Sequence, residues 1–267
     1  MMFEAYRVPR DFMPFWHFGA RMGIGTVRRF YARMRRRGFA VVLDAGTGGG
    51  ANALLGAWMG YRVTACDLSY AALAALRHTA HRTVPPAPAA PAQSDSCALP
   101  FRDAAFDIVI ASHIIEHLAD PRALLRECLR VLRPNGVLRV SCPSRSHGMR
   151  VGLWFGLELD PGDHVVQGYS AGDIAAMLPG GARIARVTYQ GRFIESNMSD
   201  AQFLIARATG ISGNPAVAGA RRQPPIWVFL AKELVTWPLL VLAKCEDAAL
   251  SFMKGSMISI EIEKHCE

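Results

Sequence analysis

The chain has 267 residues, of which 51% are hydrophobic, and a formal net charge of +8. This length suits one large α/β domain with appendages and is too short to favour two full domains. Its six cysteines include no Cys-x-x-Cys pair, and the amino terminus lacks the apolar core of a secretion signal. We therefore expect reduced thiols and a cytoplasmic protein.

The positive charge is concentrated near the amino terminus. Residues 1–37 hold nine arginines and only two acidic residues, a net charge of +7. Aromatic residues are mixed with these arginines, which is typical of a basic amphipathic helix. Such a segment can lie on an anionic membrane, bind an acidic substrate, or pack beside a sheet with its arginines solvated. No recognised nucleic-acid-binding module accompanies it, so we expect no nucleic-acid partner.

An apolar run that ends in a glycine-rich turn organises the rest of the chain. Val41–Ala45 predicts a buried strand, and 51–59 predicts the helix after the turn. The turn between them contains Gly46, Thr47, Gly48 and Gly50. Because glycines remove Cβ atoms from one side of a turn, its backbone can form the floor of a cofactor site.

A second strand follows at 62–66 and ends in Asp67. An acid at the carboxyl end of this strand is placed to accept both hydroxyls of a ribose. Gly46, Gly48 and Ala51 also satisfy the dinucleotide fingerprint, so an NAD-dependent oxidoreductase is an alternative at this point.

The next stretch predicts a helix and then an irregular strand. Ser69 can cap a helix that runs to about Arg82. Residues 84–92 contain four prolines and therefore predict a loop or stiff spacer. The third strand of the sheet must be short, at about 90–94.

Three later segments have a characteristic order and spacing. They are D-x-x-x-L-P-F…F-D-x-V at 95–109, E-H-L-A-D-P at 116–121 and R-E-x-x-R-V-L-R-P-N-G-V-L at 126–138. Together with 41–50 they resemble the motifs of class I S-adenosylmethionine-dependent methyltransferases, among them the ubiquinone-biosynthesis type. Asn135 stands where the family has a glycine, and asparagine also tolerates positive φ.

The resemblance implies a Rossmann-like, doubly wound, mostly parallel sheet of seven strands in the order 3-2-1-4-5-7-6. The sixth and seventh strands would be 182–189 and 257–262. It also implies S-adenosylmethionine as cofactor, with the glycine turn facing its amino-carboxypropyl arm and Asp44 compensating its ammonium. Asp67 would bind the ribose, and Asp95 would accept from the adenine amine beside Ser96. The full set of expected cofactor residues is Asp44, Gly46, Thr47, Gly48, Gly50, Asp67, Leu68, Asp95, Ser96 and Ser112.

Three histidines are candidates for the base that removes the acceptor's proton. They are His117, His113 and His164, since an imidazole titrates near the working pH. The segment His113–His117 also matches the H-x-x-E-H motif of some zinc peptidases, which would need a third ligand. Some ubiquinone-type enzymes carry acidic and histidine residues at this place that could hold a divalent cation, but His113 departs from their glutamate pattern. We predict no metal.

The chain divides into four predicted parts. Residues 1–37 form the basic arm, 38–191 the methyltransferase core, 192–252 an insertion or lid, and 253–267 the last strand. Within the insertion, 226–243 has the length of a membrane span but carries Lys232 and Glu233 near its middle, which disfavours a crossing. A monotopic hairpin, an apolar lid or a buried helix are the alternatives.

Together these features predict methyl transfer to a small, hydrophobic or lipid-linked acceptor, with O-methylation favoured. The arm and the apolar insertion suggest peripheral contact with the inner face of a membrane. A protein- or nucleic-acid-directed methyltransferase, an NAD-dependent oxidoreductase and a noncatalytic membrane-associated protein are the competing hypotheses.

Overall fold

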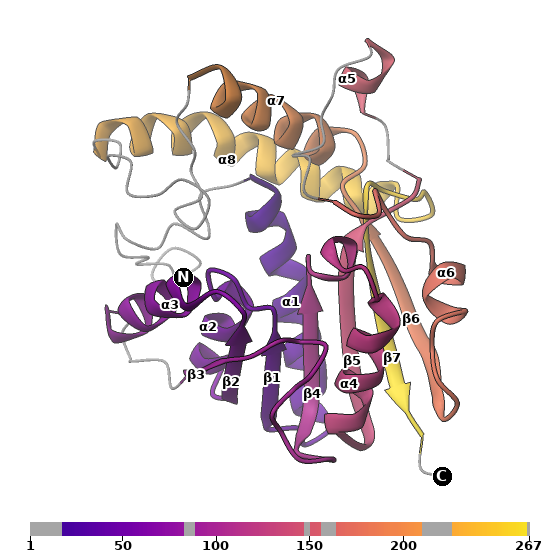
Figure 1. Ribbon diagram of the computed structural model, residues 1–267. Coiled ribbons are helices and arrows are strands. Elements are labelled where there is room, and N and C mark those ends of the chain that lie inside the picture. The colour runs from indigo at the N-terminus through magenta and orange to yellow at the C-terminus, as the bar shows by residue number, and fades with distance from the viewer. Residues whose placement is uncertain (1–17, 83–88, 147–149, 156–163, 210–225, 266–267) are drawn as a thin grey trace.

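The computed structural model describes residues 18–82, 89–146, 150–155, 164–209 and 226–265. One seven-stranded sheet forms the centre of the fold, in the order β3-β2-β1-β4-β5-β7-β6 (Figure 1). The strands are β1 (Val41–Ala45), β2 (Arg62–Asp67), β3 (Ala89–Gln93), β4 (Phe106–Ser112), β5 (Leu132–Pro143), β6 (Ala182–Gln190) and β7 (Met257–Lys264). The predicted strand order is confirmed, and β7 runs antiparallel to both of its neighbours.

The short third strand begins at Ala89, one residue earlier than expected. It pairs with β2 alone and forms one edge of the sheet. Pro91 is tolerated there because an edge strand does not need every N–H for pairing.

Helices cover both faces of the sheet. They are α1 (Phe18–Arg36), α2 (Ala51–Trp58), α3 (Tyr70–Arg82), the 3₁₀ turn η3 (Ile115–His117), α4 (Pro121–Val131), α5 (Val151–Trp154), α6 (Ala171–Ala175), α7 (Ile194–Thr209) and α8 (Ile226–Ala249). Several begin at local caps: Ser69 accepts a hydrogen bond from Ala72 N at 3.3 Å, and Asp120 caps α4, which starts with a proline. The predicted cap at Ser69 is therefore present.

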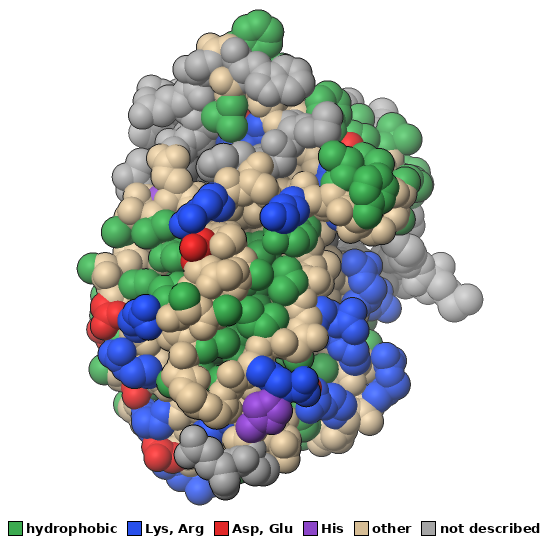
Figure 2. Space-filling view, turned by 90° about the vertical axis from the view of Figure 1, so that its right-hand side faces the viewer, with side chains coloured by type: hydrophobic (Ala, Val, Ile, Leu, Met, Phe, Trp, Pro, Cys, Tyr) green, Lys and Arg blue, Asp and Glu red, His purple; other side chains and the backbone are tan. Residues whose placement is uncertain are grey.

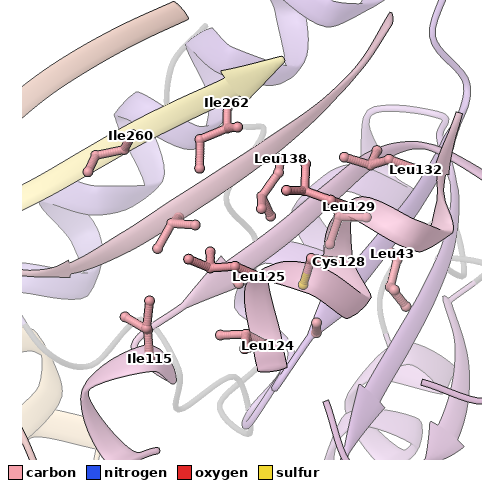
Figure 3. Close-up of a cluster of buried hydrophobic side chains, with 14 of the residues drawn as sticks. Leu43, Ile115, Leu124, Leu125, Cys128, Leu129, Leu132, Leu138, Ile260 and Ile262 are labelled. Carbon is pink, nitrogen blue, oxygen red and sulfur yellow. The ribbon is translucent and has the colours of Figure 1, made fainter. Parts of the chain in front are cut away.

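Two apolar cores lie on opposite faces of the sheet. One includes Leu43 of β1, α4 residues such as Leu125 and Cys128, and β7 residues such as Ile260 (Figure 3). The other joins α1, α2 and α3 to β1, β2 and β4. The apolar runs that were predicted to form buried strands are buried on both faces of the sheet. Parallel strands between two layers of helices require this.

Two of the family-like motifs brace each other. Glu127 accepts a hydrogen bond from Leu99 N at 2.8 Å, and Arg130 donates to Leu99 O at 2.9 Å and to Phe101 O at 2.8 Å. The R-E-x-x-R segment of α4 thus holds the L-P-F loop in place. These hydrogen bonds explain why the L-P-F and R-E-x-x-R motifs occur together in the sequence.

The aspartate of the F-D-x-V motif lies at the start of β4. It stabilises the start of β1, whereas the glycine turn follows the end of β1. Asp107 Oδ2 accepts from the backbone N–H groups of Ala40 and Val41, both at 2.9 Å, and its Oδ1 pairs with Arg133. Burial opposes ionisation of Asp107, but these hydrogen bonds and the guanidinium lower its pKa below the usual value. The start of β1 is therefore anchored by a charged acceptor.

The described part of the basic arm is a packed helix. Phe30, Tyr31 and Met34 of α1 are buried in the second core. Arg33 pairs with Glu261 of β7, and Arg37 pairs with Glu263 at 2.8 Å. Residues 1–17 lie outside the described residues.

Helices α7 and α8 lie beyond the carboxyl ends of the parallel strands (Figure 1). Leu240 and Ala243 of α8 are buried against Ile194 and Met198 of α7, so the two helices pack on each other. Within the described ranges, no helix is long and apolar enough to cross a membrane. The segment 210–225 between them falls outside those ranges.

Candidate cofactor site

The glycine turn after β1 adopts positive φ angles, which glycine accepts more readily than other residues. Gly46, Gly48 and Gly50 have φ values of 67°, 51° and 81°. A Cβ on Gly46 would collide with Ile114, and one on Gly50 would collide with Leu76. A Cβ on Gly48 would meet no protein atom within 4 Å. The turn is packed at its two ends and open in the middle, which fits a cradle for a ligand.

Asp67 lies beside this open backbone at the carboxyl end of β2. Its Oδ2 accepts from Gly48 N at 2.7 Å, and its Oδ1 accepts from Ser69 N at 2.9 Å. Each carboxylate oxygen has a second lone pair, so both can still accept from a ligand hydroxyl. Asp67, the residue predicted to bind the ribose, therefore supports the glycine turn and keeps lone pairs for a ligand hydroxyl.

Two apolar side chains next to Asp67 are uncovered. Leu68 is 72% exposed and Tyr70 is 70% exposed. Gln93 at the end of β3 donates to Leu68 O at 3.0 Å, which fixes the backbone of this segment. An exposed apolar surface beside a ribose-binding acid suits the flat face of an adenine ring.

Asp95 and Ser96 follow the carboxyl end of β3, as Asp67 lies at the carboxyl end of β2. Asp95 Oδ1 accepts from Cys97 N at 2.8 Å, and the side chain is exposed. Ser96 is buried, and its hydroxyl has no hydrogen-bond partner among the residues that the structure describes. A buried hydroxyl of this kind can serve a ligand polar group at low cost, because it gives up no protein partner.

Asp44 is almost completely buried, with 1% of its surface exposed. Its Oδ2 accepts from Thr47 Oγ1 at 2.6 Å and from Ala53 N at 3.1 Å, so it ties the turn to the start of α2. Burial raises its pKa to about 7, although these hydrogen bonds lower it. A nearby cation would favour the ionised form.

Beyond Ser112, the end of β4 turns sharply at His113. This residue has φ 54°, a rare value for a residue other than glycine, and its N–H donates to Ser141 O at 2.8 Å. Its imidazole is largely exposed, and Nδ1 lies 3.3 Å from Oε1 of Glu116. The sequence analysis assigned no role to Glu116, which lies between Ile115 and His117.

The other two predicted histidines, His117 and His164, lie next to each other. The imidazole centroids of His117 and His164 are 4.9 Å apart, with the rings tilted by 62°. Val165 N and Val166 N both donate to Glu116 O, at 2.9 and 3.1 Å, which docks this segment on η3. The fold therefore gathers all three candidate bases around Glu116.

The strands that carry these residues are similar to a known protein family. Residues 43–140 match the family of the methyltransferase domain. This segment of the chain is therefore similar to a methyltransferase domain. The matched segment runs from β1 into β5 and contains the glycine turn, Asp67, Asp95 and Glu116. Relatives that match this segment are named as S-adenosylmethionine-dependent methyltransferases.

The curated relatives agree with this assignment over the same region. A protein of Mycobacterium tuberculosis named "Probable S-adenosylmethionine-dependent methyltransferase" is 39% identical over 104 residues, which are 39% of this chain and 36% of the relative. A ubiquinone biosynthesis O-methyltransferase of Caulobacter vibrioides is 33% identical over 39% of this chain and 41% of its own length. A demethylmenaquinone methyltransferase of Corynebacterium efficiens is 36% identical over 43% of this chain and 46% of its own. The chain thus spans less than half the length of each.

Solved structures share the fold over most of the chain. A "putative sarcosine dimethylglycine methyltransferase" of Galdieria sulphuraria is 17% identical with a TM-score of 0.59, covering 89% of this chain and 85% of its own. The [4+2]-cyclase SpnF is 22% identical with a TM-score of 0.58, covering 90% and 81%. A cyclase therefore has the same fold, so the fold by itself does not define the reaction.

We expect Asp67→Asn to weaken S-adenosylmethionine binding about tenfold or more, because one charge-assisted acceptor for the ribose hydroxyls is lost. Asparagine keeps an oxygen that can accept from Gly48 N, whereas alanine would also release the glycine turn. Isothermal titration calorimetry measures the affinity, with the exposed Asp103→Asn as matched control. Unchanged affinity in Asp67→Asn would show that the ribose binds elsewhere.

Binding of the cofactor should depend on pH through Asp44. Because its pKa is about 7 without ligand, binding of the cofactor ammonium must expel a proton at lower pH. Affinity should therefore fall as pH drops from 8 to 6, by up to about tenfold per unit below the pKa. Calorimetry in buffers of different ionisation enthalpy should detect the released proton. Asp44→Asn should abolish the dependence, and a variant that keeps it would assign the proton to another group.

Proposed function

We propose that the protein transfers a methyl group from S-adenosylmethionine to an oxygen of a small hydrophobic or lipid-linked acceptor. The observation that carries this proposal is the open backbone at Gly48 beside Asp67, within the matched methyltransferase domain. The uncovered Leu68 and the buried, unpartnered Ser96 hydroxyl extend the same surface toward an adenine.

The chemistry asks little of the protein beyond positioning and proton removal. The cofactor supplies an electrophilic methyl group on a positively charged sulfur. The acceptor oxygen forms the new O–C bond as the S–C bond breaks, its electron pair returns to sulfur, and the acceptor's proton passes to a base. The acceptor must therefore lie in line behind the methyl group and within reach of a basic side chain.

His113 is the best placed of the three candidate bases. It directly follows the last residue of β4, next to the segment that contacts the glycine turn through Ile114. A proton on Nδ1 faces Glu116, and this tautomer leaves the lone pair of Nε2 to accept a proton. The negative charge of Glu116, 3.3 Å from Nδ1, would stabilise the imidazolium that forms.

Apolar side chains support a hydrophobic acceptor. Phe155 after α5 is 77% exposed, Leu153 of α5 is 42% exposed, and Phe193 before α7 is 40% exposed. These elements lie beyond the carboxyl ends of the strands, where the methyl group would be presented (Figure 1). The relatives named for ubiquinone and menaquinone methylation support the same class of acceptor.

We also propose that the enzyme works at a membrane surface. Trp237, Val241 and Leu242 of α8 are 42–53% exposed, and Arg28, Arg29 and Arg36 of α1 are exposed. Figure 2 shows a group of hydrophobic side chains above a column of lysine and arginine side chains on one side of the molecule. Apolar side chains next to cations suit an anionic lipid surface.

Labelled cofactor tests the reaction. The purified protein is incubated with methyl-labelled S-adenosylmethionine and either the organic or the aqueous phase of a bacterial cell extract. We expect label in a product from the organic phase, and we expect His113→Ala to slow it by about a hundredfold or more without weakening cofactor binding. The exposed His78→Ala on α3 is the control. Label only in the aqueous phase would make the acceptor a polar metabolite, and no label in either would favour a noncatalytic protein.

Liposome sedimentation tests the membrane contact. The protein should sediment with anionic liposomes at low salt and less with neutral ones, because arginines near the surface contribute about 1 kcal/mol each. Replacing Trp237 and Leu242 together by serine should weaken binding at both low and high salt, since this part is apolar. Protein that stays in the supernatant at low salt would contradict the proposal.

A further inference from the structure

Glu116 is a buried acid without an ordinary partner. It has 0% exposed surface, and within the described part of the chain neither carboxylate oxygen makes a hydrogen bond. The Nδ1 of His113 lies 3.3 Å from Oε1, outside hydrogen-bonding geometry. A carboxylate taken out of water without hydrogen bonds is strongly unfavourable unless a positive charge compensates it.

Two imidazoles converge on this carboxylate from different segments. One potential ligand atom from each of Glu116, His117 and His164 lies within 4.8 Å of the other two. His117 is on η3 with Glu116, whereas His164 begins the segment that docks on η3 through Val165 N and Val166 N. These backbone bonds hold the two segments together without help from a ligand. The three donors are therefore brought together by the fold.

We propose that Glu116, His117 and His164 bind a divalent transition-metal ion. Two imidazole nitrogens and one carboxylate oxygen suit Zn²⁺, Fe²⁺ or Mn²⁺, whereas Mg²⁺ prefers oxygen donors and bound water. The ion supplies the positive charge that the buried Glu116 lacks. Three protein ligands leave at least one coordination position open for another molecule.

The position of this site suggests what the open coordination position binds. Ile114, two residues before Glu116, packs against Gly46 of the glycine turn. A metal-bound acceptor oxygen would then lie near the methyl group, and the ion would lower the pKa of that oxygen and favour its attack. This catalytic role rests on the proposed methyl transfer. Binding of the ion itself does not depend on it.

Cobalt and zinc are direct probes because they need no cofactor or acceptor. The full-length protein is freed of metal by dialysis against a chelator and titrated with Co²⁺, whose visible absorption reports coordination by protein ligands. We expect one Co²⁺ per chain, displaced by Zn²⁺ and not by Mg²⁺. Failure of the wild-type protein to take up either Co²⁺ or Zn²⁺ in stoichiometric amount would overturn the proposal.

Variants identify the ligands. His117→Ala and His164→Ala should each weaken Co²⁺ binding about tenfold or more. Glu116→Gln should do the same while keeping the side-chain volume, and circular dichroism checks that each variant is folded. His78→Ala, which removes an exposed histidine of α3, is the matched control and should bind as the wild type. Wild-type affinity in His164→Ala would overturn the site.

His113→Ala distinguishes this ligand set from one made only by the H-x-x-E-H segment. With His164 as third donor, loss of His113 should leave the stoichiometry and spectrum of bound Co²⁺ unchanged. Loss of binding in His113→Ala together with retention in His164→Ala would reject the proposed geometry. The titration is done without S-adenosylmethionine, so its outcome is independent of whether methyl transfer is observed.

Discussion

The backbone of the glycine turn is held open by two carboxylates, and the rest of the cofactor site depends on that arrangement. Asp44 ties the turn to α2 from below, and Asp67 accepts from Gly48 N at the neighbouring strand end. Ile114 and Leu76 fill the space beside the first and last glycines. Because every one of these contacts comes from a different element, the turn keeps its shape only when the parallel sheet is assembled around it.

Two carboxyl groups are buried near the carboxyl ends of β1 and β4. Asp44 and Glu116 are both nearly or fully buried, one beneath the cofactor cradle and the other beneath the histidines. Buried carboxylates disfavour the empty site and favour a site that holds a cation, whether an ammonium or a metal ion. In both places, binding would relieve a cost that folding imposes.

Helices α1, α7 and α8 lie outside the segment that matches the methyltransferase domain. Helix α1 covers one face of the sheet and joins it through ion pairs to β7, so part of the arginine cluster is structural. Helices α7 and α8 pack on each other beyond the strand ends, where an acceptor would enter. Trp237, Val241 and Leu242 of α8 are exposed apolar residues, and such residues on a surface often mark a site of interaction.

Local patterns were sufficient to predict the strands, their order through the family resemblance, and the placement of Gly48, Asp67 and Asp95 at one edge. Apolar runs, glycines and acids at strand ends are short-range features, because the residues that define them are adjacent in the chain. Such short-range features could not predict that His164 lies beside Glu116. Their association depends on two backbone bonds between segments nearly fifty residues apart, which only the tertiary structure brings together.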